Sequence, residues 1–222
     1  MIKKILGFLI IFFPWKLRRL LLIKIWKYKI HPTSKIGFSY IFPRYLEMHE
    51  KSKIGHLNVA IHLEKVILGK NSSIGRSNWI TGFPLNNVNH FSHQPDRKCE
   101  LIIGNNSAIT KNHHLDCTNQ ILIGNFVTIA GYNSQFLTHS IDIYENRQDS
   151  HSIRIGDFTF IGTNVVVLGG SVLPSYSVLG AKALLNKSFN ESWALYGGVP
   201  ARKVTEIQND AKYFHRTSGY IY

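Results

Sequence analysis

The side chains best suited to acid–base chemistry in this sequence lie in a polar, irregular segment, residues 138–152, which contains His139 near its start. An imidazole group has a near-neutral pKa, so a well-positioned histidine can remove the proton of a hydroxyl group and make its oxygen nucleophilic. Such a base needs an acceptor that orients its ring, and Asp116 is a candidate. An equal alternative for Asp116 is a corner residue that is hydrogen-bonded to its own turn.

Cysteine chemistry is less favoured than histidine chemistry. The sequence contains only Cys99 and Cys117, which are too few for a disulfide framework and are expected to be reduced thiols. We rank Cys117 as an acyl-carrying nucleophile below His139 as a general base, because only the nearby histidines could activate its thiolate.

Composition and charge limit the classes of protein that fit. The 222-residue chain is 44% hydrophobic and 18% charged, as expected for one globular domain with an appendage. Its formal charge is +13, yet residues 1–29 hold eight basic and no acidic side chains, which leaves only +5 for the other 193 residues. Charge concentrated at one terminus argues against a nucleic-acid-binding body, so no nucleic-acid partner is predicted.

An apolar run near the N-terminus, residues 5–13, is closed by Pro14. Its nine residues are too few for a membrane-spanning helix, which needs about 20. The run resembles the core of a secretion signal, but bulky and basic residues follow where a cleavage site needs small ones. We therefore predict that the segment is retained and does not cross a membrane by itself.

Residues 15–28 have a helical pattern. Leu17, Leu21 and Ile25 fall on one stripe, and most basic residues fall on another arc, although Arg18 does not. With two tryptophans nearby, residues 1–29 are predicted to form an amphipathic helix in the interface of an anionic membrane leaflet. The alternative is a helix packed on the protein body or on a partner subunit.

The body of the chain repeats with a period of six. Aliphatic residues six positions apart are Ile155, Ile161, Val167, Leu173, Leu179 and Leu185. Small or β-branched residues stand four positions after the first five of these: Thr159, Val165, Ser171, Ser177 and Ala183. Weaker copies of the pattern reach back to Ile36. A period of six fits neither a 3.6-residue helix nor a long strand, which leaves short strands joined by turns.

Three such strands per turn would form a coil with its aliphatic residues inside, and the coils would stack at about 4.8 Å. An ordinary β-sandwich with coincidental spacing is the alternative. The repeat resembles the hexapeptide-repeat family of left-handed parallel β-helices over residues 31–205, and the left-handedness is implied by that resemblance alone. The expected fold is therefore all-β. Its predicted divisions are an N-terminal helix over 1–29, a β-helix domain over 30–205 and a tail over 206–222.

Functional sites are expected where the repeat breaks, because loops of a solenoid lie on its surface. Residues 82–100 form one break, which we interpret as an arm over an acceptor pocket or a contact within a trimer. Residues 138–152 form the second, and residues 196–203 close the coils.

The motifs at these breaks resemble the acyltransferase branch of the hexapeptide-repeat family. The chain has Thr138-His139 before a loop, then Ile161-Gly162-Thr163-Asn164-Val165-Val166, then Gly198-Val199-Pro200-Ala201-Arg202. The match is most similar to sugar O-acetyltransferases of the maltose, galactoside and surface-polysaccharide type. It implies acetyl-CoA as co-substrate, with His139 as general base and no metal.

The resemblance also implies roles for other residues. Thr163 corresponds to a serine near the thioester, where a hydroxyl can stabilise the oxyanion. Ala181 and Asn186 correspond to positions lining the pantetheine groove, and Arg202 and Lys203 to basic contacts with CoA phosphates. A solvated basic pair is the alternative for these last two.

On the acceptor side, Asn112 matches an asparagine or aspartate that faces sugar hydroxyls, and His113 and His114 extend from the same coil. His113 is bulky at a position where the repeat needs a small residue, which hints at a site. Gln148 and Asp149 are weaker candidates. The shorter loop and the 82–100 insertion depart from the maltose type and leave the sugar's identity open.

Two other functions are weighed. Zinc carbonic anhydrases share this fold but need two histidines five residues apart on one segment, whereas the fifth residue after His139 is Tyr144. A non-catalytic scaffold that binds membrane or glycan is the second. The favoured expectation is an O-acetyltransferase for a surface polysaccharide or its lipid-linked precursor, cytoplasmic and peripheral to the inner face of the cell membrane. Relatives of this type form homotrimers with sites between subunits.

Overall fold

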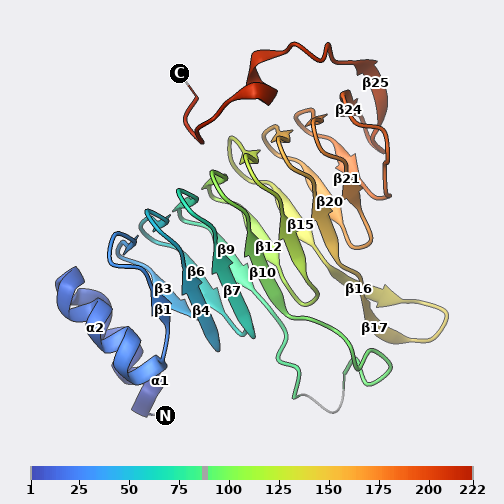
Figure 1. The fold of residues 1–222 in the computed structure, drawn as a ribbon. Helices are drawn as coiled ribbons and strands as arrows, with labels where there is room; N and C mark the ends of the chain where they lie inside the picture. Colours follow the sequence, from blue (N-terminus) through green and yellow to red (C-terminus); the bar gives the residue numbers. More distant parts are fainter. Residues whose placement is uncertain (1, 87–89, 222) are drawn as a thin grey trace.

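The computed structural model describes residues 2–86 and 90–221, and it is a stack of coils with helices at the N-terminal end (Figure 1). Each regular coil contributes one strand to each of three sheets, and neighbouring coils pair in parallel. The period of six therefore sets short strands separated by turns, as expected. Within the arm, residues 87–89 lie outside the described residues.

The described residues place seven strands in sheet A: β1 (Lys29–Ile30), β4 (Tyr45–Met48), β7 (Lys65–Leu68), β10 (Glu100–Ile103), β13 (Ile121–Ile123), β18 (Ile153–Ile155) and β21 (Val172–Leu173). Sheet B has nine in the same part of the chain: β2 (Lys35–Ile36), β5 (Lys53–Ile54), β8 (Ser73–Arg76), β11 (Ala108–Lys111), β14 (Thr128–Ile129), β19 (Phe160–Ile161), β22 (Val178–Leu179), β24 (Ala194–Gly197) and β25 (Arg202–Glu206).

Sheet C has seven strands within the described ranges: β3 (Tyr40–Phe42), β6 (Val59–Ile61), β9 (Trp79–Thr81), β12 (His114–Asp116), β15 (Gln135–Leu137), β20 (Val166–Leu168) and β23 (Leu184–Leu185). Two antiparallel elements interrupt the regular pattern. The hairpin β16 (His139–Asp142) and β17 (Arg147–Ser150) projects after β15, and β25 turns back on β24 to end the stack.

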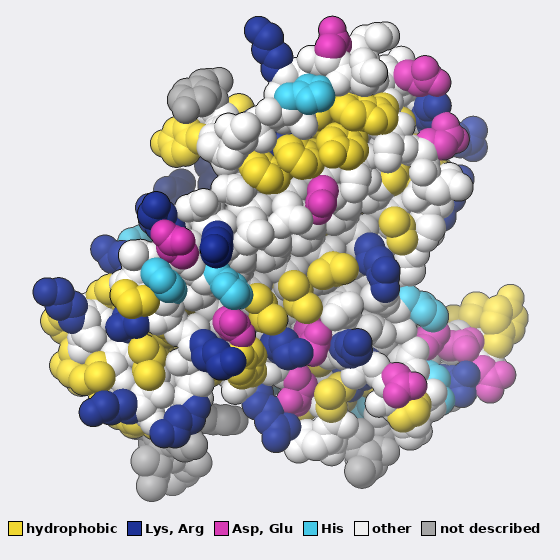
Figure 2. All heavy atoms as spheres, in the orientation of Figure 1, with side chains coloured by type: hydrophobic (Ala, Val, Ile, Leu, Met, Phe, Trp, Pro, Cys, Tyr) yellow, Lys and Arg dark blue, Asp and Glu magenta, His cyan; other side chains and the backbone are white. Residues whose placement is uncertain are grey.

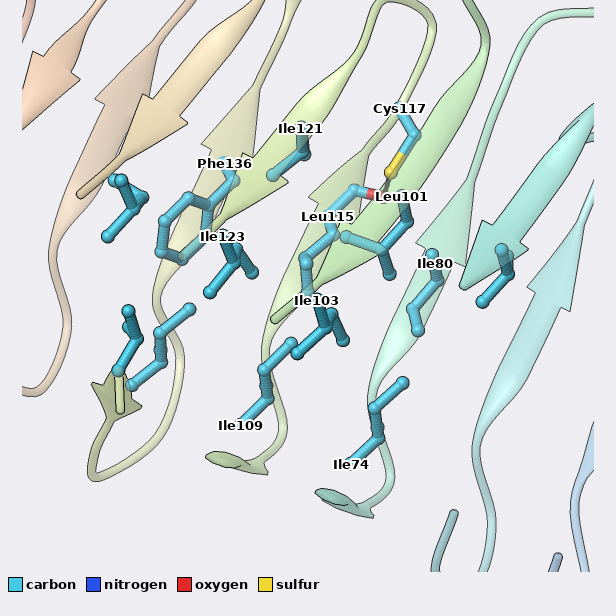
Figure 3. Packing of buried hydrophobic residues seen from close by; sticks show 14 of the residues in the cluster. Ile74, Ile80, Leu101, Ile103, Ile109, Leu115, Cys117, Ile121, Ile123 and Phe136 are labelled. Carbon is cyan, nitrogen blue, oxygen red and sulfur yellow. Dashed lines mark hydrogen bonds between the residues drawn. The ribbon is translucent and has the colours of Figure 1, made fainter. Parts of the chain in front are cut away.

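The core is a set of columns of aliphatic side chains inside the coils (Figure 3). Ile74, Ile109 and Ile129 are in register in sheet B, and each is almost fully buried. Close stacking of the coils also explains why position 75 is a glycine. A Cβ atom there would lie 1.9 Å from the carbonyl oxygen of Thr110 in the next coil. Each coil thus buries its apolar side chains against the coils above and below it.

The N-terminal segment forms two helices rather than one. Helix α1 (Ile2–Leu9) runs into a short 3-10 turn, η1 (Ile10–Phe12), and α2 (Trp15–Trp26) begins after Pro14, whose missing N–H and fixed φ suit a helix start. No helix among residues 2–86 and 90–221 is long and apolar enough to cross a membrane.

Helix α2 packs on the first coil. Leu22 is buried in the core, and the guanidinium of Arg18 is buried where it donates to the carbonyl oxygens of Gly37 (2.7 Å) and Ser39 (2.7 Å). Arg18, which did not fit the expected polar arc, therefore belongs to the buried face, while Leu17 of the expected apolar stripe is exposed. The helix caps the open end of the β-helix.

The C-terminal tail folds back along the stack (Figure 1). In its 3-10 turn η2 (Lys212–His215), Phe214 is buried against Tyr176 and Trp193, which stack on each other with ring centroids 4.7 Å apart. The tail is thus held by aromatic contacts.

Removing a core side chain tests the stacking. We expect Leu101→Ala, at a fully buried position in β10, to lower the free energy of unfolding by about 2–5 kcal/mol, because the lost contacts leave a cavity. Urea unfolding of Ile143→Ala, at a position 78% exposed, is the control, and it should change by no more than about 0.5 kcal/mol. Equal effects at both positions would contradict the assigned core.

Candidate active site

His139 is placed by the coil that precedes it. Thr138 is buried at the end of sheet C, where its Oγ1 donates to the carbonyl oxygen of Asp116 (2.8 Å) and accepts from the backbone N–H of Asn119 (2.8 Å). Strand β16 then leaves the coil at the edge between sheets C and A, which we call the C–A edge. The local geometry thus fixes the chain one residue before the imidazole.

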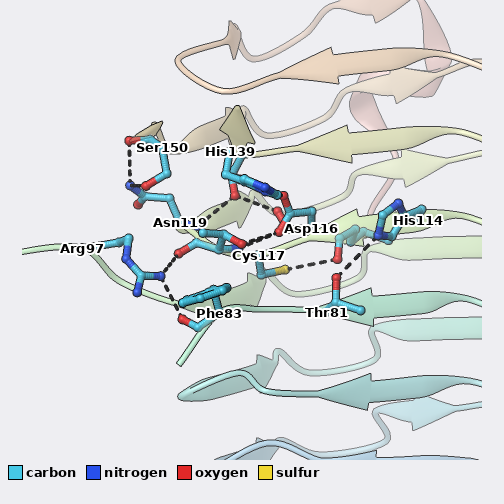
Figure 4. A network of polar contacts seen from close by, with 12 residues as sticks. Thr81, Phe83, Arg97, His114, Asp116, Cys117, Asn119, His139 and Ser150 are labelled. Carbon is cyan, nitrogen blue, oxygen red and sulfur yellow. Dashed lines mark hydrogen bonds and ion pairs between the residues drawn. The ribbon is translucent and has the colours of Figure 1, made fainter. Parts of the chain in front are cut away.

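His139 and Asp116 form a hydrogen-bonded pair across two coils (Figure 4). Nδ1 of His139 lies 2.5 Å from Oδ2 of Asp116, which is buried at the end of β12. Oδ1 of Asp116 accepts from the backbone N–H (3.0 Å) and from Oγ1 (2.6 Å) of Thr118. The carboxylate therefore both orients the histidine ring and caps its own turn, so the two interpretations of Asp116 are compatible.

The pair favours charges on both partners. The hydrogen bond with Asp116 raises the pKa of His139 above 6.5, although desolvation and the charge of Arg97 oppose the shift. Burial alone would raise the pKa of Asp116, but the hydrogen bonds from His139 and Thr118 outweigh it and hold that pKa below its usual value. The site therefore stabilises the imidazolium that a general base becomes after it accepts a proton.

The arm, residues 82–100, packs against this pair within the same chain. Arg97 is buried, and it donates to the carbonyl oxygens of Thr118 (2.5 Å) and Phe83 (2.9 Å). Its guanidinium lies 4.4 Å from the ring centroid of Phe91, and the Phe91 ring meets the His139 ring edge to face at 6.4 Å. The arm thus forms an apolar wall beside the histidine.

Sequence reasoning gave no role to Arg97, Phe91 or Thr118. The spacing Asp116-x-Thr118 is a recognisable side-chain turn and could have indicated Thr118. The first two lie in an irregular segment without periodicity, so nothing in the sequence placed them beside His139.

The hairpin closes the other side of the arm. Asp149 is held by Nε2 of Gln94 (2.7 Å), His93 (3.3 Å) and His151 (3.1 Å), so its carboxylate joins the hairpin to the arm. This network makes Asp149 a structural residue rather than a free acceptor ligand. Gln148 does line an open cavity of about 410 Å³ between the arm and the hairpin, with Phe91 and Arg147 among its other walls.

The three residues of the Asn112 segment have different positions. The interpretation of His113 as an acceptor residue is wrong, because its ring is buried and hydrogen-bonded to the N–H of Ser134 (3.1 Å) and to Thr110 Oγ1 (3.0 Å). Burial lowers the pKa of His113 to about 4.

His114 is half-buried on the outer face of sheet C, two residues before Asp116 on the same face. Its Nε2 lies 3.5 Å from Thr81 Oγ1 (Figure 4). Asn112 is exposed at the other end of β12, at the edge between sheets B and C, called here the B–C edge.

The candidate donor residues also divide between these two edges. Thr163 follows β19 at the B–C edge, where its Oγ1 bonds to the backbone of Tyr132, and Ala181 stacks in the coil above it. Asn186 follows β23 at the C–A edge. Within one chain, Thr163 lies before the start of β20, at the B–C edge, whereas His139 follows β15, the partner strand of β20, at the C–A edge. The length of β20 therefore separates the two side chains, and they do not meet.

The two basic residues at the closure, Arg202 and Lys203, make different contacts. Lys203 Nζ lies 2.8 Å from Glu191 and 3.2 Å from Glu206, so nearby carboxylates already balance its charge. Arg202 is exposed, pairs with Gly197 near the B–C edge and has no ion-pair partner in the described part of the chain. Arg202 is the better of the two as an anion contact.

Other chemistry is not supported by the geometry. Cys117 is fully buried, and burial raises the pKa of its thiol well above the usual value, which disfavours a nucleophilic thiolate. Among the described residues, no three histidine, cysteine or acidic side chains are grouped as a metal site would need.

Comparisons with known proteins agree with this fold. No protein-family model matches the sequence, and a search of curated proteins finds no significant match. The hexapeptide-repeat acetyltransferase VCA0836 of Vibrio cholerae is 26% identical, with a TM-score of 0.51 over 64% of this chain and 74% of its own.

The same Vibrio protein has a structure in complex with acetyl coenzyme A, with 25% identity and a TM-score of 0.52 over 64% of this chain and 71% of that one. The polysialic acid O-acetyltransferase OatWY has a TM-score of 0.59 at 17% identity, over 86% of this chain and 90% of its own, and supports the fold. The solenoid is thus a left-handed parallel β-helix, and the chain is an acyltransferase-type enzyme whose structural neighbours are hexapeptide-repeat acetyltransferases.

Proposed function

We propose that this chain is an acetyl-CoA-dependent O-acetyltransferase that acts on a sugar hydroxyl of a surface polysaccharide or its lipid-linked precursor. The observation that carries the proposal is the His139–Asp116 pair, which holds a half-exposed imidazole by Nδ1. Nε2 has no hydrogen-bond partner in the described residues and is left for the acceptor. OatWY, a polysialic acid O-acetyltransferase, shares the fold and makes a saccharide a reasonable acceptor class.

In the proposed reaction, Nε2 of His139 takes the proton of the sugar hydroxyl while the hydroxyl oxygen bonds to the thioester carbonyl carbon. Collapse of the tetrahedral intermediate breaks the carbon–sulfur bond. The leaving thiolate takes the proton from the imidazolium, so the products are an acetyl ester and free CoA. Asp116 acts as a positioning residue, because it holds the ring and stabilises its charged form.

The acceptor would enter beside the arm and the hairpin. The cavity there has Gln148 and Arg147 as hydrogen-bonding walls and Phe91 as an apolar wall that reaches the His139 ring. An amide and a guanidinium can hydrogen-bond to the hydroxyl groups of a saccharide, whereas the Phe91 ring is almost fully buried. His114 on sheet C is the other acceptor candidate that lies near Asp116.

The donor side requires a second copy of the chain. Thr163 and Arg202 lie along the B–C edge. The unpaired guanidinium of Arg202 suits a CoA phosphate, and the Thr163 hydroxyl, which donates to the carbonyl oxygen of Tyr132 in this structure, would have to turn toward the thioester oxygen. His139 lies along the C–A edge, so the two sets can serve one reaction only if the B–C edge of one copy meets the C–A edge of another. A contact between unlike edges forms a closed ring when the rotation between copies closes, and a homotrimer suits a three-sided coil.

Replacing His139 tests the base. We expect His139→Ala to reduce acetyl transfer from acetyl-CoA by about 10²- to 10⁴-fold, the typical contribution of a general base. Thiol release with a panel of sugars and oligosaccharides measures it. His31→Ala, an exposed histidine on the first coil, is the matched control and should transfer normally.

A scaffold function would give a different result. If neither the wild type nor His139→Ala binds acetyl-CoA, the chain is a non-catalytic scaffold and the proposed enzyme activity is wrong. If His139→Ala transfers as well as the wild type, another group is the base.

The pH dependence tests the pair. Catalysis needs neutral His139, and Asp116 raises the pKa of its ring, so the acidic limb of kcat/KM should lie above pH 6.5. Asp116→Asn removes the charge that raises this pKa, so the limb should move to lower pH while the plateau rate falls. Asp149→Asn removes a carboxylate that contacts other histidines and should leave the limb in place. An unmoved limb in Asp116→Asn would show that a different group titrates.

Mixed assemblies test the shared site. If Thr163 serves the His139 of a neighbouring copy, His139→Ala and Thr163→Ala should each be impaired, but co-assembly in equal amounts should restore about a quarter of the sites, because random rings contain intact pairs of edges. Thiol release of the mixture, with its mass measured by light scattering, checks this. Impaired variants that never complement each other would contradict a site that combines His139 of one copy with Thr163 of another.

A further inference from the structure

We propose that the outer face of the N-terminal helices is a docking surface for an anionic lipid bilayer. The face, here called the N-terminal patch, consists of exposed apolar residues on α1, η1 and α2: Phe8, Leu9, Phe12, Phe13, Leu17 and Leu20. This inference goes beyond the proposed acetyl transfer and does not depend on it.

The patch remains apolar and exposed even though the helices pack on the body. Ile10 and Leu22 are buried in the core and make the contact between the helices and the body, so the exposed apolar residues are not needed for that packing. Phe8 and Phe12 nevertheless remain 57% and 59% exposed. Phe12 contacts Phe8 (5.7 Å between ring centroids) and Phe38 of the first coil (5.0 Å), so the aromatic surface extends from the helices to the coil.

Positive charge surrounds this apolar surface. Lys16 and Lys24 are exposed on α2, and Lys27 is exposed at its C-cap; Lys24 shares an outward face with Leu17 and Leu20 by helical spacing. The chain has no acidic residue before Glu47. In Figure 2, hydrophobic and basic side chains alternate over the region where Figure 1 shows these helices.

This combination selects a lipid surface as the occupant. Phenylalanines inserted among acyl chains, with lysines at the level of anionic headgroups, are the usual arrangement of an interfacial helix. A second copy of the same patch would bring Lys16, Lys24 and Lys27 near the same three lysines, with no acidic residue in positions 1–46 to offset them, and like charges disfavour that contact. Helices of eight and twelve residues are too short for a hydrocarbon core of about 30 Å, so they would lie along its surface.

Vesicle sedimentation of the full chain tests the proposal. Phosphatidylcholine vesicles with phosphatidylglycerol should bind the wild type, vesicles without it should bind more weakly, and added salt should reduce the difference. Truncation of residues 1–29 is a poor test because it would uncap the core. Point variants of exposed side chains should leave the thermal unfolding unchanged.

Two sets of variants separate the apolar and the charged contributions. Phe8→Ser with Phe12→Ser should reduce binding to both kinds of vesicle by at least tenfold. Lys16→Ser with Lys24→Ser and Lys27→Ser should reduce binding to the anionic vesicles alone, by about fivefold for each lysine. Ile143→Ser, an exposed apolar side chain between Asp142 and Glu145 on the hairpin, is the control and should bind as the wild type does.

The proposal fails if the wild type does not sediment with anionic vesicles or if the Phe8/Phe12 variant binds as well as the wild type. It also fails if that variant only splits an oligomer in solution, since the patch would then be a contact between copies. Acetyl transfer to a soluble saccharide, measured in parallel, reports on the proposed function separately from membrane binding.

Discussion

Each short strand of this protein can bury only one or two side chains, so no coil is stable until another coil covers it. Ile74, Ile109 and Ile129 illustrate the constraint, because they are in register in three successive coils and each is almost fully buried. Stacking in register therefore fixes the backbone along the whole stack. The first coil has no coil before it to cover its core. Helix α2 covers this end: Leu22 is buried against the core, and Arg18 donates to the carbonyl oxygens of Gly37 and Ser39.

The same regularity determines where a site can form. Inward positions are taken by the core, and outward positions repeat at fixed intervals, so reactive groups converge only where two coils place residues at one corner and a loop closes over them. Asp116 and His139 meet this condition because both stand at the end of a sheet C strand in successive coils. The arm adds Arg97, whose charge opposes the rise that Asp116 causes in the pKa of His139, and Phe91, whose ring meets the imidazole edge to face.

Much of this could be predicted from the sequence because the repeat is a physical pattern. The period of six predicted the short strands and the aliphatic side chains of the core. Asp116 was also a candidate partner for His139, and the two side chains do meet. The period did not give the interior of the breaks, where Phe91 is placed by long-range contacts such as the cation–π contact with Arg97. It also misassigned His113, since a bulky polar residue at a small-residue position suggested a site, whereas Ser134 and Thr110 satisfy both ring nitrogens inside the corner. The helical pattern showed that Arg18 does not fit the polar arc, but it could not show why, because the carbonyl oxygens of Gly37 and Ser39 that accept from it belong to the first coil.

If the proposed roles of Thr163 and His139 hold, their division between two edges would make a single chain an incomplete catalyst. Three sheets give three edges, and the strands of sheet C hold Thr163 at one edge and His139 at the next. Because β20 lies between them, the proposed reaction would take its hydroxyl donor from the edge of another copy. A ring of copies would have parallel β-helix axes, and every N-terminal patch would then face the same way. Membrane docking and assembly would reinforce each other, because several patches on one ring bind a surface far more strongly than one patch does.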